Sequence, residues 1–110
     1  MKRLDPEKEI VFSRHLAFRW AKRVSNQLSI EDAEDQRTVV RRLRGQIVSG
    51  EYALIDDGEE FDHEKYRLVC NIWGETLTFV VINAKKLVFK TVWPSKKWEV
   101  KKLEDEMSNM

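Results

Sequence analysis

Residues 13–23, SRHLAFRWAKR, gather a histidine, several cations and a tryptophan in a chain whose formal net charge is only +1. In a helix, His15, Arg19 and Lys22 fall on one face, because residues three or four apart are neighbours there. An imidazole beside cations is favoured in its neutral, proton-accepting form, and guanidinium groups bind phosphate oxygens in pairs. This combination suits metal-free RNA cleavage, in which one group removes the 2′-OH proton and cations stabilise the phosphate. The alternative is that the cations coat the solvent side of an amphipathic helix.

A second basic cluster lies in RTVVRRLR, residues 37–44. Arg37, Arg41 and Arg44 share one helix face, and arginine without lysine favours phosphate contact over plain solubility. Acidic residues precede the cluster, so pairing within the helix would absorb part of the charge. Arg41 is therefore a candidate RNA contact, with a solvated face or an acidic partner protein as the alternatives.

The third cluster is LVFKTVWPSKKW, residues 87–98, where aromatic residues alternate with cations. Regular strand alternation predicts that one face carries Leu87, Phe89, Thr91 and Trp93. The other face then carries Val88, Lys90 and Val92. Aromatic rings can stack on unpaired bases and lysines can follow the phosphate backbone, which makes Trp93 and Lys90 candidate RNA contacts. Alternatively, the aromatic residues belong to the core and the lysines protect a sheet edge.

Other kinds of site have little support in the sequence. His63 lies among carboxylates in GEEFDHEKY, but the spacing fits no strong ligand motif, so we predict no metal and no cofactor. Cys70 is the single cysteine; it excludes an intramolecular disulfide and is expected to be a small buried hydrophobe. Motifs of nucleotide hydrolases, dinucleotide oxidoreductases and zinc hydrolases are missing from the sequence.

The elements that must position these residues follow from hydrophobic periodicity. Residues 13–27 are predicted to form a first helix, capped by Ser13 and buried along a stripe through Leu16 and Trp20. A second helix is predicted to begin near Ser29 and to end at residues 49–50, with a buried face through Val40, Leu43 and Ile47. A short strand at residues 9–13 is also compatible with the pattern.

After Gly50 the period changes to that of strands, which are predicted at residues 52–55, 65–73, 76–84 and 87–93. Residues 56–64 are expected to form an acidic loop, and tight turns join the later strands in antiparallel order. The fold class is therefore α+β, with two N-terminal helices packed on one face of a roughly four-stranded antiparallel sheet. The tail from residue 96 could be a short docked helix or a frayed end.

Length and composition indicate one domain over residues 1–110, with fraying possible at 1–8 and 99–110. The N-terminus is polar and the longest apolar run is far too short to cross a bilayer, so no membrane partner is expected. These features indicate a reducing, cytoplasmic environment, or delivery to the cytoplasm of a target cell.

Two segments resemble parts of a small family of uncharacterised bacterial domains. IVFSRHLAFRWAKR resembles its opening, a short strand leading into Ser/Thr-x-His-Ala-x-x-Arg-hydrophobic-x-x-Arg, with Leu16 in place of the alanine. The residues that match this register are Ser13, His15, Arg19 and Arg23. KLVFKTVWP resembles the family's last strand, a hydrophobic run ending in Thr-Val-aromatic-Pro. The family is similar to the RelE-like toxins and to the wider barnase–EndoU–colicin–RelE group of metal-independent ribonucleases.

The resemblance implies a RelE-like domain acting as an endoribonuclease toxin on RNA, either tRNA or mRNA, and neutralised by a cognate antitoxin or immunity protein. It assigns His15 as general base or acid, Arg19 as phosphate clamp and Thr91 as a hydrogen-bonding or 2′-OH-positioning group. Electrostatic support would come from Lys22, Arg23 and Lys90. The alternative is a non-catalytic module of the same fold that binds nucleic acid or a protein. The enzyme hypothesis requires His15 and Thr91 to meet on one side of the sheet.

Overall fold

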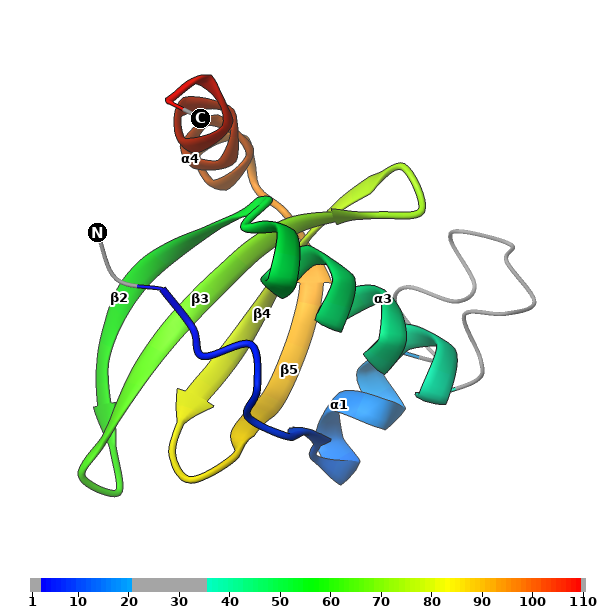
Figure 1. Ribbon diagram of the computed structural model, residues 1–110, viewed down its shortest axis with the longest axis vertical. Coiled ribbons are helices and arrows are strands. Elements are labelled where there is room, and N and C mark those ends of the chain that lie inside the picture. The colour runs from blue at the N-terminus through cyan, green and yellow to red at the C-terminus, as the bar shows by residue number, and fades with distance from the viewer. Residues whose placement is uncertain (1–2, 21–35, 110) are drawn as a thin grey trace.

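The computed structural model describes residues 3–20 and 36–109. One sheet has the strand order β1-β5-β4-β3-β2 (Figure 1). Its strands are β1 (Ile10–Phe12), β2 (Tyr52–Glu60), β3 (His63–Ile72), β4 (Glu75–Asn83) and β5 (Leu87–Pro94). The helices in the described ranges are α1 (Arg14–Arg19), α3 (Gln36–Ser49) and α4 (Lys97–Ser108).

The α+β class is confirmed, but the sheet differs from the predicted one in strand number and direction. β2 to β5 form the antiparallel meander that the turns predicted. β1 adds a fifth strand, and it pairs parallel to β5, with Ile10 opposite Leu87 and Phe12 opposite Phe89. The chain between β1 and β5 is long enough for the crossover that parallel pairing requires, so the sheet is mixed.

The main core lies between one face of the sheet and helices α1 and α3, which lie in front of the sheet in Figure 1. Leu16 and Trp20 are buried as predicted, and the remainder of the predicted first helix, from residue 21, lies outside the described residues. The buried residues of α3 are Val39, Leu43 and Ile47. Val40, predicted to be buried, only packs against the edge of this core. Burial of Cys70 is confirmed, and that burial raises the pKa of its thiol.

The predicted acidic loop is mostly strand, which corrects the expectation for residues 56–64. β2 continues to Glu60 and β3 already begins at His63, so only Phe61 and Asp62 form the turn, both with positive φ. A register shift after Asp56 interrupts the ladder, and Gly58 adopts φ 86° there. Acidic side chains are tolerated because they lie at the outer end of an edge strand, where charge also discourages pairing with other chains.

Both ends of the described chain pack against the domain. The backbone N–H of Leu4 donates to the hydroxyl of Tyr52 at 3.0 Å, and the Leu4 side chain is buried. The C-terminal tail forms helix α4, which confirms the prediction of a short docked helix over that of a frayed end. Leu103 of α4 packs with Ala53 and Val69 on the sheet face opposite α1 and α3.

A β-bulge in β5 changes which of its residues face the core. Val80 of β4 pairs with Thr91, but the next residue, Val81, pairs with Phe89, so Lys90 is the extra residue of β5. Strict alternation is therefore wrong for this strand. The buried core residues are Leu87, Phe89 and Val92, whereas Thr91 and Trp93 turn to the other face.

Candidate functional site

His15 lies on α1, the helix that packs against β5. Ser13 positions the start of this helix, because its hydroxyl accepts the N–H of Leu16 at 3.1 Å and donates to the Lys90 carbonyl at 2.8 Å. Leu16 is fully buried, while His15 beside it is exposed on the outer side of the helix. The backbone of Arg19 ends α1, and its side chain is outside the described part of the structure, as are Lys22 and Arg23 entirely.

Thr91 lies on the opposite side of the sheet from α1. It is paired with Val80, and cross-strand partners point to the same face. The neighbours of Val80 in β4, Phe79 and Val81, both point into the core beneath α1 and α3, so Val80 and Thr91 point away from it. The sheet therefore separates Thr91 from His15, and these two expected catalytic residues do not come together.

Two further residues of β5, Lys90 and Trp93, were expected to contact RNA. On the sheet face away from α1, both make contacts within the protein. Lys90 forms a hydrogen-bonded ion pair with Glu60, and this bond holds the pKa of the Glu60 carboxyl below its usual range. Trp93 donates its indole N–H to Glu99 at 3.1 Å. Both side chains thus bind the protein itself and are poorly placed to contact RNA.

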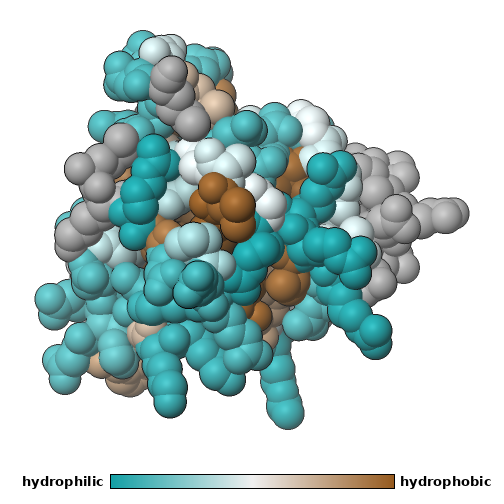
Figure 2. Space-filling model, viewed as in Figure 1, coloured by the Kyte–Doolittle hydropathy of each residue, from teal (hydrophilic) through white to brown (hydrophobic). Residues whose placement is uncertain are grey.

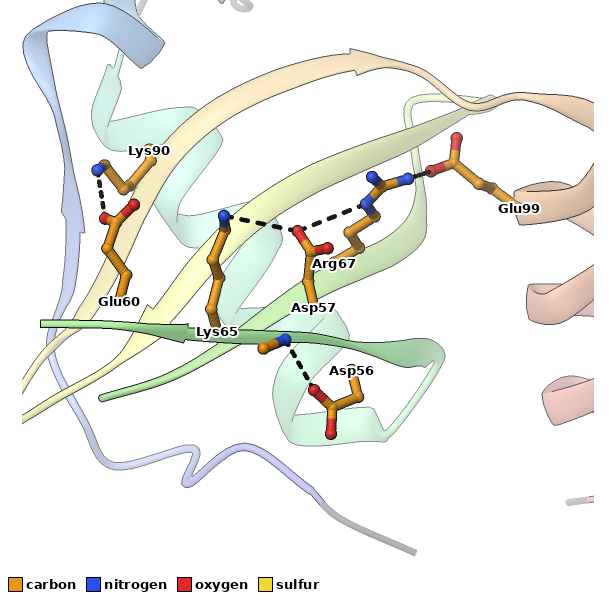
Figure 3. Close-up of polar contacts among 8 residues, drawn as sticks. Asp56, Asp57, Glu60, Lys65, Arg67, Lys90 and Glu99 are labelled. Carbon is orange, nitrogen blue, oxygen red and sulfur yellow. Dashed lines mark hydrogen bonds and ion pairs between the residues drawn. The ribbon is translucent and has the colours of Figure 1, made fainter. Parts of the chain in front are cut away.

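Figure 3 shows the ion pairs that cover this face of the sheet. The carboxylate of Asp57 lies 3.8 Å from Lys65 and 3.6 Å from Arg67, and Arg67 also lies 3.5 Å from Glu99. Each of these cations has a carboxylate neighbour, so the positive charge is largely compensated here. Such a face has little net attraction for a phosphate backbone.

The surface of α3 has the opposite character. Its fourteen residues include four arginines and no acidic residue. A hollow of about 610 Å³ along the helix is lined by Gln36, Arg37, Val40, Arg41 and Arg44. Arg44 donates to the carbonyl of Pro6, whereas Arg41 is exposed and makes no ion pair with any described residue. The three arginines that the sequence assigned to one helix face do border a common space.

A second hollow, of about 280 Å³, lies further along α3. Its lining residues are Thr38, Arg41, Arg42, Gly45 and Gln46. Arg41 borders both hollows, and the guanidinium of Arg42 lies 5.9 Å from the ring centroid of Trp73 in the β3–β4 turn. Figure 2 shows the outer side of α3 as mainly hydrophilic, with hydrophobic side chains between. Gly45 and Gln46 were missed by the sequence analysis, although a glycine inside a helical pattern is a signal that could have drawn attention to them.

The remaining candidates among the described residues are His63 and a smaller hollow on β2 and β3. His63 is exposed at the start of β3. A smaller hollow of about 230 Å³ is lined by Asp56, Gly58, Glu59, Glu64 and Tyr66. Within residues 3–20 and 36–109, no group of three or more His, Cys, Asp or Glu residues is arranged to hold a metal ion. In the same ranges, no helix is both long and apolar enough to cross a membrane.

Comparisons with known proteins identify no relative of this chain. No family model matches the chain, and neither the curated proteins nor the solved structures contain a match.

Proposed function

We propose that this chain binds RNA through the basic face of α3, as a module whose binding does not depend on the catalytic residues expected from the sequence. The observation that carries the proposal is the row of Arg37, Arg41 and Arg44 along one hollow, on a helix whose described residues, 36–49, include no acidic residue. Arginine matches phosphate oxygens bidentately, and release of counterions from the phosphate backbone supplies most of the affinity of such a surface.

The spacing of these arginines suits a phosphate backbone. Arg37 and Arg44 are seven residues apart, which places their positions about 10 Å apart along the helix axis. Val39, Leu43 and Ile47 anchor the other side of α3 in the core, so the helix presents its arginines from a rigid support. An exposed helix face held in this way can contact successive phosphates without a change in the fold.

The endoribonuclease hypothesis is less favoured by this geometry. His15 and Thr91 lie on opposite sides of the sheet, and Lys90 is paired with Glu60. An enzyme would therefore have to use groups other than Thr91 beside His15. RNA cleavage is therefore measured together with binding, because cleavage of the RNA would support the endoribonuclease hypothesis.

The proposal is tested by Arg41→Ala, read by fluorescence anisotropy with a labelled RNA oligonucleotide. Affinity of the unaltered chain should fall steeply as salt rises from about 50 to 200 mM, and Arg41→Ala should reduce the log–log slope by about 0.7. The matched control is Lys101→Ala, which removes an exposed cation from α4 and should leave affinity and slope unchanged.

Two outcomes would contradict the proposal. Binding that does not depend on salt, or equal effects of Arg41→Ala and Lys101→Ala, would exclude a phosphate contact at α3. A denaturing gel of the same RNA, with and without EDTA, reads cleavage; cleavage that His15→Ala abolishes would establish the enzyme instead.

A further inference from the structure

Gly45 lies inside α3, four residues before the helix ends. Glycine destabilises a helix interior relative to alanine, so its presence calls for a reason. The backbone supplies none, because the glycines with positive φ in the described residues are Gly50, Gly58 and Gly74. Packing supplies none either, because a Cβ at Gly45 would have no described atom within 4 Å apart from its chain neighbours and the backbone of its own helix.

What Gly45 does provide is a stretch of helix surface without a side chain, in the same hollow as Arg41 and Arg42. Gly45 lines the hollow of about 280 Å³ together with Thr38, Arg41, Arg42 and Gln46. Arg41 also borders the larger hollow of the arginine row, so the two spaces adjoin along the helix. The guanidinium of Arg42, a residue that lines the smaller hollow, lies over the ring of Trp73, 5.9 Å from its centroid.

The chemistry of this smaller hollow suits a nucleobase better than a phosphate. Backbone N–H groups in the middle of a helix are used by the helix itself, so no backbone donors are available to cradle an anion. Planar guanidinium groups stack on bases, and the Gln46 amide offers both a donor and an acceptor to a base edge. A base in a duplex is stacked and paired, whereas an unpaired base can enter such a hollow.

We infer that the RNA bound by α3 is single-stranded and that one unpaired base sits above Gly45, between Arg41 and Arg42, while the neighbouring phosphates follow the arginine row. This inference rests on the proposed function of α3. It explains why a glycine stands at position 45, because the methyl group of an alanine there would occupy the place of the base.

The test compares one labelled RNA as a single strand and annealed to its complement, at the same salt concentration. The single strand should bind more tightly than the duplex. Gly45→Ala should weaken binding of the single strand by about tenfold and leave duplex binding unchanged, although the same variant should unfold at a higher temperature. Val48→Ala, at an exposed position of α3 outside both hollows, is the matched control and should not change either affinity.

The possible results separate this inference from the proposed function. Equal affinity for single strand and duplex, or an unchanged single-strand affinity in Gly45→Ala, would overturn the inference while salt-dependent binding would still support the RNA interface. If the unaltered chain binds neither RNA in a salt-dependent way, the proposed function and the inference both fail.

Discussion

Glu99 shows how a single residue can hold two parts of this molecule together. Its side chain is fully buried, and one carboxylate oxygen accepts the N–H groups of Lys96 and Trp93. The other oxygen has no hydrogen-bond partner among residues 3–20 and 36–109 and lies 3.5 Å from Arg67. The guanidinium of Arg67 also lies over the rings of Trp93 and Trp98, at 5.4 and 5.7 Å from their centroids. A buried carboxylate is tolerated only with such compensation, so Glu99 ties α4 to the sheet.

Removal of this carboxylate should destabilise the fold. Glu99→Ala leaves the half-buried Arg67 without one of its two carboxylate neighbours and the start of α4 without its cap, which we expect to lower the free energy of unfolding by about 2–3 kcal/mol. Urea denaturation followed by circular dichroism measures the change. Glu104→Ala, at an exposed position of α4, should change it by less than about 0.5 kcal/mol. Equal denaturation midpoints for the two variants would show that the buried ion pair contributes nothing.

Strand β5 shows how one extra residue in a strand can place a candidate site residue, Thr91, on the other face of the sheet. The bulge at Lys90 frees its carbonyl from the ladder, and Ser13 at the start of α1 donates to that carbonyl. The same bulge turns Val92 into the core and Thr91 away from α1. The strand thus supports the N-terminus of α1 from its backbone, while its polar side chains serve the other face of the sheet.

Thr91→Val tests this placement directly. Because Thr91 lies across the sheet from α3, the substitution should leave RNA affinity within about twofold of the unaltered chain, as expected for a site outside the interface. Anisotropy with the same RNA measures affinity, and circular dichroism confirms that the sheet is retained. A large loss of affinity, or loss of an RNA cleavage activity, would mean that Thr91 does belong to the functional site.

At the scale of the whole molecule, the described residues form two hydrophobic clusters with the sheet between them. The larger one packs α1 and α3 against the sheet, and the smaller one packs Leu103 of α4 against Ala53 and Val69. The basic surface is supported by the larger cluster only, and the compensated charges lie on the side of the smaller one. The proposed RNA binding and the attachment of α4 therefore involve different sides of the sheet.

Two core substitutions, one on each side of the sheet, should differ in their effect on RNA affinity. Leu43→Ala removes a fully buried side chain beneath the arginine row and should cost about 3–5 kcal/mol of folding free energy and weaken RNA binding. Leu103→Ala, in the smaller cluster, should cost about 2 kcal/mol and leave RNA affinity unchanged. Denaturation and anisotropy on the same samples measure both effects. A loss of affinity in Leu103→Ala would show that the two sides are coupled.

Much of the fold was predictable because burial within one element is a local property. The spacing of Leu16 and Trp20, the alternation around Cys70 and the end of α3 at Ser49 are all visible in short windows of sequence. The arginine row was predictable for the same reason, since Arg37, Arg41 and Arg44 share a face in any regular helix. The extension of β2 to Glu60 was not, because its acidic residues are typical of loops and are tolerated only at the edge of this sheet.

The sequence by itself indicated most of the helices and strands, the basic clusters and the arginine row on α3. Tertiary structure alone decided that β1 lies parallel to β5, that Glu99 finds Arg67, and that Thr91 faces away from His15. The physical reason is that these features depend on pairing between segments distant in the chain. A bulge is set by the neighbouring strand, and a buried charge is stable only where folding brings its partner.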